Sequence, residues 1–157
     1  MNIRLITIGK TDNKNLQSLI EDYTKRLSFY VKFDLDIIAD IKNVKNLSEA
    51  QQKEKEGELI LSKISATDNL ILLDENGKTF NSVGFSNYLQ KKMNAGTKTL
   101  VFVIGGPYGF SETVYQKANG KVSLSEMTFS HQMVRLFVIE QIYRGFTILK
   151  NEPYHHQ

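Results

Sequence analysis

The sequence contains no cysteine, no tryptophan, only two prolines and no long uninterrupted apolar run. Without cysteine, neither a disulfide framework nor a thiolate metal site is available, which favours a reducing, cytoplasmic location. No stretch approaches the roughly 18 consecutive apolar residues of a membrane span, and the N-terminus lacks the layout of a signal peptide. With 157 residues, 41% of them hydrophobic, the sequence predicts a single domain over residues 1–157 with one sizeable core.

Acidic residues are scarce in one part of the chain. Residues 1–78 carry 12 Lys/Arg against 13 Asp/Glu, whereas residues 79–157 carry 8 against 4. Between Asn76 and Ser111 there is no acid, and four lysines lie in that interval: Lys78, Lys91, Lys92 and Lys98. This bias is compatible with a polyanionic partner, and equally with lysines that are simply solvated on helices.

Apolar residues alternate between strand-like and helix-like spacing along the whole chain. Strands are predicted at residues 2–8, 33–37, 69–73, 99–104 and 122–124. Helices are predicted at residues 16–27, from a Ser48/Gln51 capping box to about residue 64, from Ser82 to residue 93, from Ser111, and from about residue 131 to 146. An Asn76-Gly77 pair signals a turn after Asp74. The runs NLILL and LVFVI are apolar on both faces, which is typical of buried parallel strands in an α/β fold flanked by helices.

A glycine-rich turn, Gly105-Gly106-Pro107-Tyr108-Gly109, follows the fourth predicted strand. It is not a Walker loop, because no Gly-Lys-Ser/Thr follows, and Pro107 occupies the place of the second glycine in G-x-G-x-x-G. Either a ligand approaches the backbone here, or glycine merely supplies a positive φ. Because ligands of parallel sheets bind beyond the carboxyl ends of the strands, the segments after Leu73, Ile104 and Leu124 are the places to look.

The segment VSLSEMTFSHQ, residues 122–132, is the second candidate. Main-chain amides of such a loop could hydrogen-bond an adenine edge while Leu124, Met127 and Phe129 grip its faces. The alternative is that Met127 and Phe129 fill the core.

The last predicted helix, MVRLFVIEQIYRGFTIL, is apolar almost all round, so a second copy of the chain is expected to cover it. Arg144 on this helix either contacts a phosphate or a ligand carboxylate, or pairs with Glu140 four residues earlier. The tail KNEPYHHQ is expected to fray as termini do, although a tyrosine and two histidines after a proline could fold over a site. Three histidines without a thiolate make a poor metal site, so no metal is expected.

Three stretches, VIGGPYGFS, LSEMTFSHQMVRLFVIEQIYR and the closing PYHHQ, resemble the small bacterial 23S ribosomal RNA pseudouridine N3-methyltransferases of the SPOUT superfamily. The likeness extends over the whole chain, including LITIGK near the start and KEKEGELIL in the middle. It implies a SPOUT-type, mostly parallel sheet flanked by helices, a C-terminal trefoil knot and a homodimer. It also implies the methyl donor S-adenosylmethionine and, as substrate, a pseudouridine in helix 69 of 23S ribosomal RNA in the assembled ribosome.

The resemblance further implies the site residues. The donor pocket would be formed by Leu73, Gly105, Leu124, Ser125, Glu126, Met127, Thr128 and Phe129. Tyr154 and His155 of the tail would reach the donor's methyl group and the target base, with His155 or His131 helping to remove the N3 proton and Arg144 contacting a phosphate or the donor carboxylate. Relatives usually carry Arg or Lys where His156 stands, so an RNA contact there becomes weaker or dependent on pH.

Two other functions remain open on the sequence alone. A non-catalytic ribosome-binding module could keep the same fold, and it would show no donor affinity. A flavodoxin-like nucleotide binder would need a phosphate loop, and none is found in the sequence.

Overall fold

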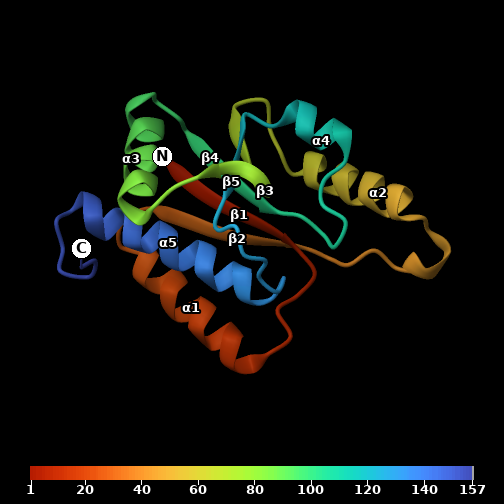
Figure 1. Cartoon of the computed structure of the whole chain (residues 1–157), viewed down its shortest axis with the longest axis horizontal. Coiled ribbons are helices and arrows are strands. Elements are labelled where there is room, and N and C mark those ends of the chain that lie inside the picture. The colour runs from red at the N-terminus through yellow and green to blue at the C-terminus, as the bar shows by residue number, and fades with distance from the viewer. Residues whose placement is uncertain (157) are drawn as a thin grey trace.

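Five parallel strands form one sheet in the order β2-β1-β4-β3-β5 (Figure 1). The computed structural model describes residues 1–156. The strands are β1 (Asn2–Ile8), β2 (Lys32–Ile38), β3 (Asp68–Thr79), β4 (Thr99–Ile104) and β5 (Gly120–Ser123). Because the strands are parallel, the carboxyl ends of β3, β4 and β5 meet at one edge of the sheet.

Helices cover both faces of the sheet. On one face lie α1 (Lys14–Ser28), α3 (Ser82–Asn94) and α5 (Met133–Leu149), with α5 in contact with both others. On the other face lie α2 (Glu49–Ser62), which follows a 3-10 turn at Val44–Asn46, and the short α4 (Glu112–Lys117). Figure 1 shows α2 and α4 together at one side of the molecule and α1 alongside α5. Within residues 1–156, no helix is long and apolar enough to cross a bilayer.

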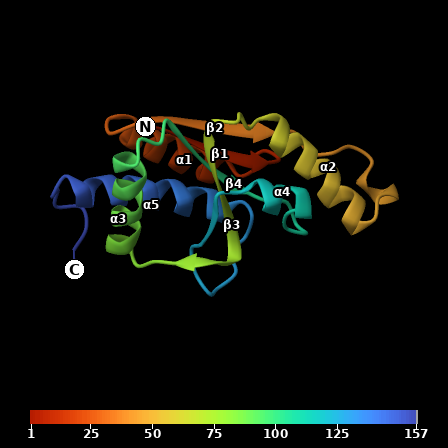
Figure 2. The same ribbon diagram turned by 90° about the horizontal axis from the view of Figure 1, so that it is seen from above.

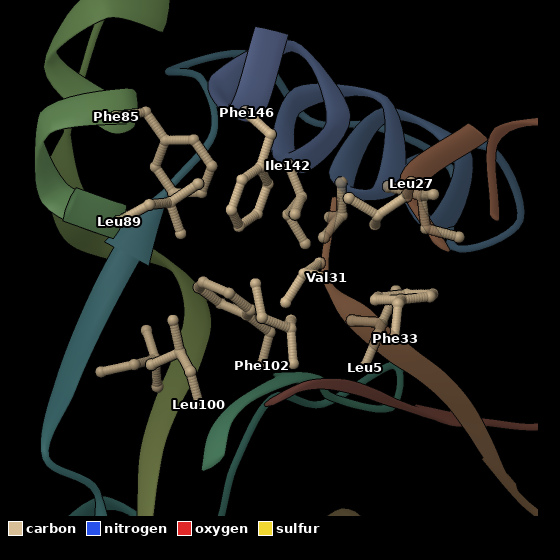
Figure 3. Packing of buried hydrophobic residues seen from close by; sticks show 14 of the residues in the cluster. Leu5, Leu27, Val31, Phe33, Phe85, Leu89, Leu100, Phe102, Ile142 and Phe146 are labelled. Carbon is tan, nitrogen blue, oxygen red and sulfur yellow. The ribbon is translucent and has the colours of Figure 1, made fainter. Parts of the chain in front are cut away.

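The core has two parts because strand side chains alternate between the faces. Leu100 and Phe102 of β4 point to the face of α1, α3 and α5, where Figure 3 shows them opposite Phe85, Leu89 and Phe146. The side chains of Val101 and Val103 in the same strand point to the opposite face and belong to the smaller cluster beneath α2 and α4. The α/β fold with a parallel sheet covered on both faces is therefore confirmed.

The local signals at the helix starts are confirmed for α2 and α4. Ser48 Oγ accepts from the Gln51 amide at 3.1 Å, and Gln51 Oε1 accepts from the Ser48 amide at 2.9 Å, which completes the predicted capping box. Ser111 caps α4 by accepting from the Val114 amide.

Two helix starts differ from the prediction. Asn81, not Ser82, caps α3, because its Oδ1 accepts from the Gly84 amide at 2.7 Å. The last helix begins at Met133 rather than near His131, because Ser130 Oγ accepts from the Met133 amide and holds the preceding residues in a turn.

The predicted turn at Asn76-Gly77 is wrong, since β3 continues to Thr79. Its pairing with β5 shifts register, so that Leu73 and Lys78 both lie opposite Val122 and the residues between them leave the ladder. A Cβ on Gly77 would lie 2.5 Å from the Val122 carbonyl carbon, so glycine is needed because two backbones meet there, not because the chain reverses.

Candidate functional site

A cavity of about 500 Å³ opens at the carboxyl ends of β4 and β5, beside residues 73–76 of β3, where that strand leaves its ladder with β5. It is lined by residues 73–76 of β3, by the glycine turn after β4, by residues 122–129 at the end of β5 and in the following loop, and by His131 and Val134. The three segments that sequence reasoning selected therefore converge. All the predicted pocket residues line this cavity: Leu73, Gly105, Leu124, Ser125, Glu126, Met127, Thr128 and Phe129.

Of the two roles open for the glycine turn, the structure shows the positive φ, and it adds close packing against side chains of the same chain. Gly109 has a φ of 77°, which favours glycine, and its amide donates to the Gly106 carbonyl at 3.2 Å. Gly105 and Gly106 instead permit close approach: a Cβ on Gly105 would lie 3.1 Å from the Phe110 ring, and one on Gly106 would meet the Glu56 carboxyl group. Phe110 and Glu56 pack against one side of the turn, and its other side lines the cavity.

The loop after β5 is held by its own hydroxyl groups. Ser123 Oγ donates to the Ser125 carbonyl at 3.0 Å, and Ser125 Oγ accepts from the Met127 amide at 2.9 Å. The Met127 side chain is 78% exposed, so the alternative that it fills the core is wrong. Phe129 lies at the surface against Phe137 of α5, with 5.1 Å between the ring centroids.

The charge of the cavity is one-sided. Asp74, Glu75 and Glu126 line it, and among residues 1–156 no lysine or arginine does. Asp74 accepts from the Tyr115 hydroxyl and from the Asn76 amide. Burial, followed by this hydrogen bond to Asp74, raises the pKa of Tyr115 to about 12, so the phenol stays neutral as a donor. Such a lining disfavours phosphate and suits a ligand with positive charge.

Arg135 of α5 holds the end of the loop after β5 against the end of β1, a role that the sequence did not reveal. Its guanidinium donates to the His131 carbonyl at 3.0 Å, the Gly9 carbonyl at 2.8 Å, Thr11 Oγ1 at 3.0 Å and the Ile8 carbonyl at 2.8 Å. The pocket loop and the end of β1 are thereby joined through one buried cation. An arginine inside an otherwise apolar helical run was the signal that could have indicated this.

The tail folds back onto α5, so the expectation that it frays is wrong for Tyr154 and His155. The Tyr154 hydroxyl donates to Glu140 Oε1 at 2.9 Å and lies 3.2 Å from the Tyr23 hydroxyl. Arg144 donates to the same Glu140 oxygen at 2.6 Å and packs over the Tyr154 ring, 4.6 Å from its centroid. The Arg144–Glu140 pair that was one alternative for Arg144 is therefore formed.

The tail cluster consists of Tyr23, Glu140, Arg144, Tyr154 and His155, and its surroundings shift the pKa of two members, Tyr154 and Arg144. Burial, and then the hydrogen bonds to Tyr23 and Glu140, raise the pKa of Tyr154, so its phenol remains protonated. Burial lowers the pKa of Arg144, but the hydrogen bond and the charge of Glu140 outweigh it and raise that pKa overall. Glu140, which joins Tyr154 to Arg144, was not predicted as a site residue. Its spacing of four residues from Arg144 was the available signal.

Within one chain, the cavity and the tail cluster lie at opposite ends of α5. The 17 residues of this helix span about 25 Å. His131 lies at the cavity end, whereas Arg144, Tyr154 and His155 lie toward the other end, where α5 leads into the tail (Figure 1, Figure 2). The structure thus brings the predicted site residues together as two groups rather than one.

Comparison with known proteins gives one consistent result. A family model described as "Predicted SPOUT methyltransferase" matches residues 1–155. Relatives named "Ribosomal RNA large subunit methyltransferase H" align over the full length of both chains: the protein of Flavobacterium johnsoniae is 85% identical over 157 residues, and that of Flavobacterium psychrophilum is 84% identical. The similarly named protein of Parabacteroides distasonis is 63% identical over the same span.

Proposed function

The chain belongs to the SPOUT methyltransferase family, and from that premise we propose that it methylates N3 of a pseudouridine in helix 69 of 23S ribosomal RNA, using S-adenosylmethionine. The relatives' name supports ribosomal RNA of the large subunit as the substrate class. Such a substrate would place the enzyme on ribosomes in the cytoplasm. The C-terminal trefoil knot that the family resemblance implies stays a prediction.

The observation that carries the proposal is the lining of the cavity. S-adenosylmethionine carries a sulfonium cation and no phosphate, and three carboxylates without a lysine or arginine suit such a ligand. Leu73, Leu124 and Phe129 supply apolar contacts for an adenine ring, and residues 125–128 of the loop after β5 line the same cavity. The volume of about 500 Å³ is within the range of small-molecule sites.

When bound, the donor supplies an already activated methyl group, so the protein has to align the base, exclude water and assist loss of the N3 proton. Tyr154 is suited to orienting the base, because its phenol stays neutral and is itself oriented by Glu140. Arg144 remains charged beside it, and its side chain, which is 25% exposed, can contact a phosphate.

The geometry of His155 bears on the identity of the general base. Its Nδ1 lies 3.2 Å from Arg144 Nη1, and a guanidinium can only donate, so Nδ1 accepts and the neutral ring carries its proton on Nε2. In this arrangement His155 presents a hydrogen-bond donor to the base. That leaves His131, at the margin of the cavity, as the favoured candidate for accepting the N3 proton.

We further propose that the active enzyme is a homodimer in which the tail of one copy completes the cavity of the other. One chain cannot supply both groups to one base across about 25 Å of helix. Around a two-fold axis, antiparallel pairing of α5 brings the end of each helix to the start of the other. Met133 and Phe137, 50% and 36% exposed, and an adjoining cavity of about 410 Å³ beside Phe129, lined by both apolar and polar side chains, provide the surface to be covered.

The proposal is tested with ribosomes from cells that lack this protein. Wild-type protein and labelled S-adenosylmethionine should add one methyl group, which mass spectrometry should locate on a pseudouridine of helix 69. The double variant Tyr154→Phe/His155→Ala should methylate at least about 100-fold more slowly, because the base loses its orienting groups. Its donor affinity should stay within about twofold of wild type, since neither side chain lines the cavity of its own chain and the proposed contact across the dimer is with the base.

The control is Asn87→Ala, which removes an exposed polar side chain from α3 and should leave both quantities unchanged. Wild-type protein that binds no donor would contradict the proposal and favour the non-catalytic ribosome-binding module. Undiminished turnover in the double variant would remove the tail from the mechanism.

A further inference from the structure

Glu56 of α2 is a buried carboxyl group that the proposed reaction does not use. Its side chain lies in the middle of the KEKEGELIL stretch, and the residue is only 3% exposed. Oε1 accepts from Gln52 Nε2 at 3.0 Å, whereas Oε2 finds no hydrogen-bond partner among residues 1–156. Burying a carboxyl oxygen without a hydrogen-bond partner costs free energy of folding, so a structural role is expected to explain its position.

The reason lies in the glycine turn above it. A Cβ built on Gly106 would overlap Oε2 of Glu56 and lie 2.7 Å from its Cδ, so the carboxyl group occupies the space that a side chain at 106 would need. Gly57, the residue after Glu56 in α2, packs in the same way against Ser111, which follows the turn and caps α4. Two consecutive residues of α2 therefore support both ends of a turn whose other side lines the donor cavity.

The surroundings of Glu56 favour its uncharged form. Burial raises the pKa of Glu56, and the charge of Asp40, which follows β2, raises it further. The Gln52 hydrogen bond from the same helix and the charge of His131, at the margin of the cavity, act in the opposite direction without cancelling the rise. Arg135 feels the charge of Asp40 as well.

We infer that Glu56 is a positioning residue for the methyl donor: its buried carboxyl group supports the main chain of Gly106 and keeps residues 105–109 in the shape that accepts the donor. This rests on the proposed function, since it takes the cavity to be the donor site. Ionisation would place a charge where Oε2 has no donor to face, and the turn would be displaced. The support is therefore complete at low pH and is lost as the pH rises through the pKa of Glu56.

The test is a calorimetric titration with S-adenosylhomocysteine, the demethylated donor, from about pH 5 to about pH 9. Wild-type affinity should fall as the pH rises. Glu56→Gln, which keeps the shape but cannot ionise, should match wild type at low pH within about twofold and lose this fall. Glu58→Gln, an exposed neighbour on the same helix, is the matched control and should follow wild type at every pH.

A double-mutant cycle tests the contact itself. Gly106→Ala should weaken binding about tenfold in the wild-type background, because the new methyl group meets the carboxyl group. In a Glu56→Ala background, the same change should cost little, because the space is free. Thermal unfolding of each variant shows whether it is folded, and Glu56→Gln keeps the test valid if Glu56→Ala is not.

Three results would overturn the inference alone: a wild-type affinity that does not fall at high pH, an equal fall in Glu56→Gln, or a Gly106→Ala cost that is the same in both backgrounds. A wild-type chain that binds neither S-adenosylhomocysteine nor S-adenosylmethionine at any pH would overturn the proposed function, and this inference with it.

Discussion

Two arginines of α5, Arg135 and Arg144, carry the same group in different surroundings. Arg135 is 3% exposed, and its partners are mostly neutral carbonyl groups, so burial lowers its pKa while the charges of Asp40 and Asp12 oppose that change. Arg144 is partly exposed and faces Glu140 directly, which raises its pKa overall. The first arginine therefore fixes backbone, whereas the second remains available to a ligand.

The structural role of Arg135 can be tested by replacing it with methionine, which has a similar length and no donors. Arg135→Met leaves the carbonyl groups of Ile8, Gly9 and His131 without their donor, so the free energy of unfolding should fall by about 3 kcal/mol. Urea denaturation measures this. Lys55→Met, an exposed cation on α2, should change it by less than about 0.5 kcal/mol. Equal stability of the two variants would contradict the role given to Arg135.

At the scale of the element, α2 shows how close packing can override helix propensity. Alanine is normally better than glycine inside a helix by about 1 kcal/mol, yet Gly57 lies in the middle of α2. A Cβ there would meet Ser111 Oγ and lie 3.1 Å from Val114 Cγ2, and both side chains are buried. Glycine at this position lets α2 approach the start of α4.

Gly57→Ala should therefore destabilise the protein despite its gain in propensity. The overlap forces α2 and α4 apart, and we expect a loss of about 2 kcal/mol in the free energy of unfolding, measured by urea denaturation. Glu58→Ala, the exposed neighbour, serves as the control and should be close to neutral. A variant as stable as wild type, or more stable, would mean that α2 relaxes freely and does not support the turn.

The elements also show which sequence signals suffice. The Ser48/Gln51 capping box was predictable because both hydrogen bonds join residues three apart. The same kind of signal does not distinguish Asn81 from Ser82, because either side chain can cap a helix. In the structure the Ser82 hydroxyl donates to Gln141 of α5, and Asn81 forms the cap. The Asn76-Gly77 pair was misread because the need for Gly77 comes from Val122, 45 positions later, and nothing local reveals that contact.

At the scale of the whole molecule, the site divides along α5. The resemblance supplied both groups of residues, the cavity and the tail, but motif order says nothing about the distance between them. The two groups are apart because the cavity adjoins the start of α5, whereas the tail packs on Glu140 and Arg144, further along this helix. Glu56 and Arg135 escaped prediction for a similar reason, as each acts on segments far from it in sequence.

If two copies share the site, two inactive chains should restore activity together. One chain carries Tyr154→Phe/His155→Ala, and the other carries Gly105→Trp, which places a large side chain against the Phe110 ring and disrupts the cavity. After unfolding and refolding as a mixture, half of the dimers pair the two chains, and each such dimer has one intact cavity facing one intact tail. Methylation of ribosomes should then reach about a quarter of the wild-type rate, although each chain refolded alone is inactive. Since a chain that used its own tail would gain nothing from the mixture, an inactive mixture that still forms dimers by light scattering would rule out the shared site.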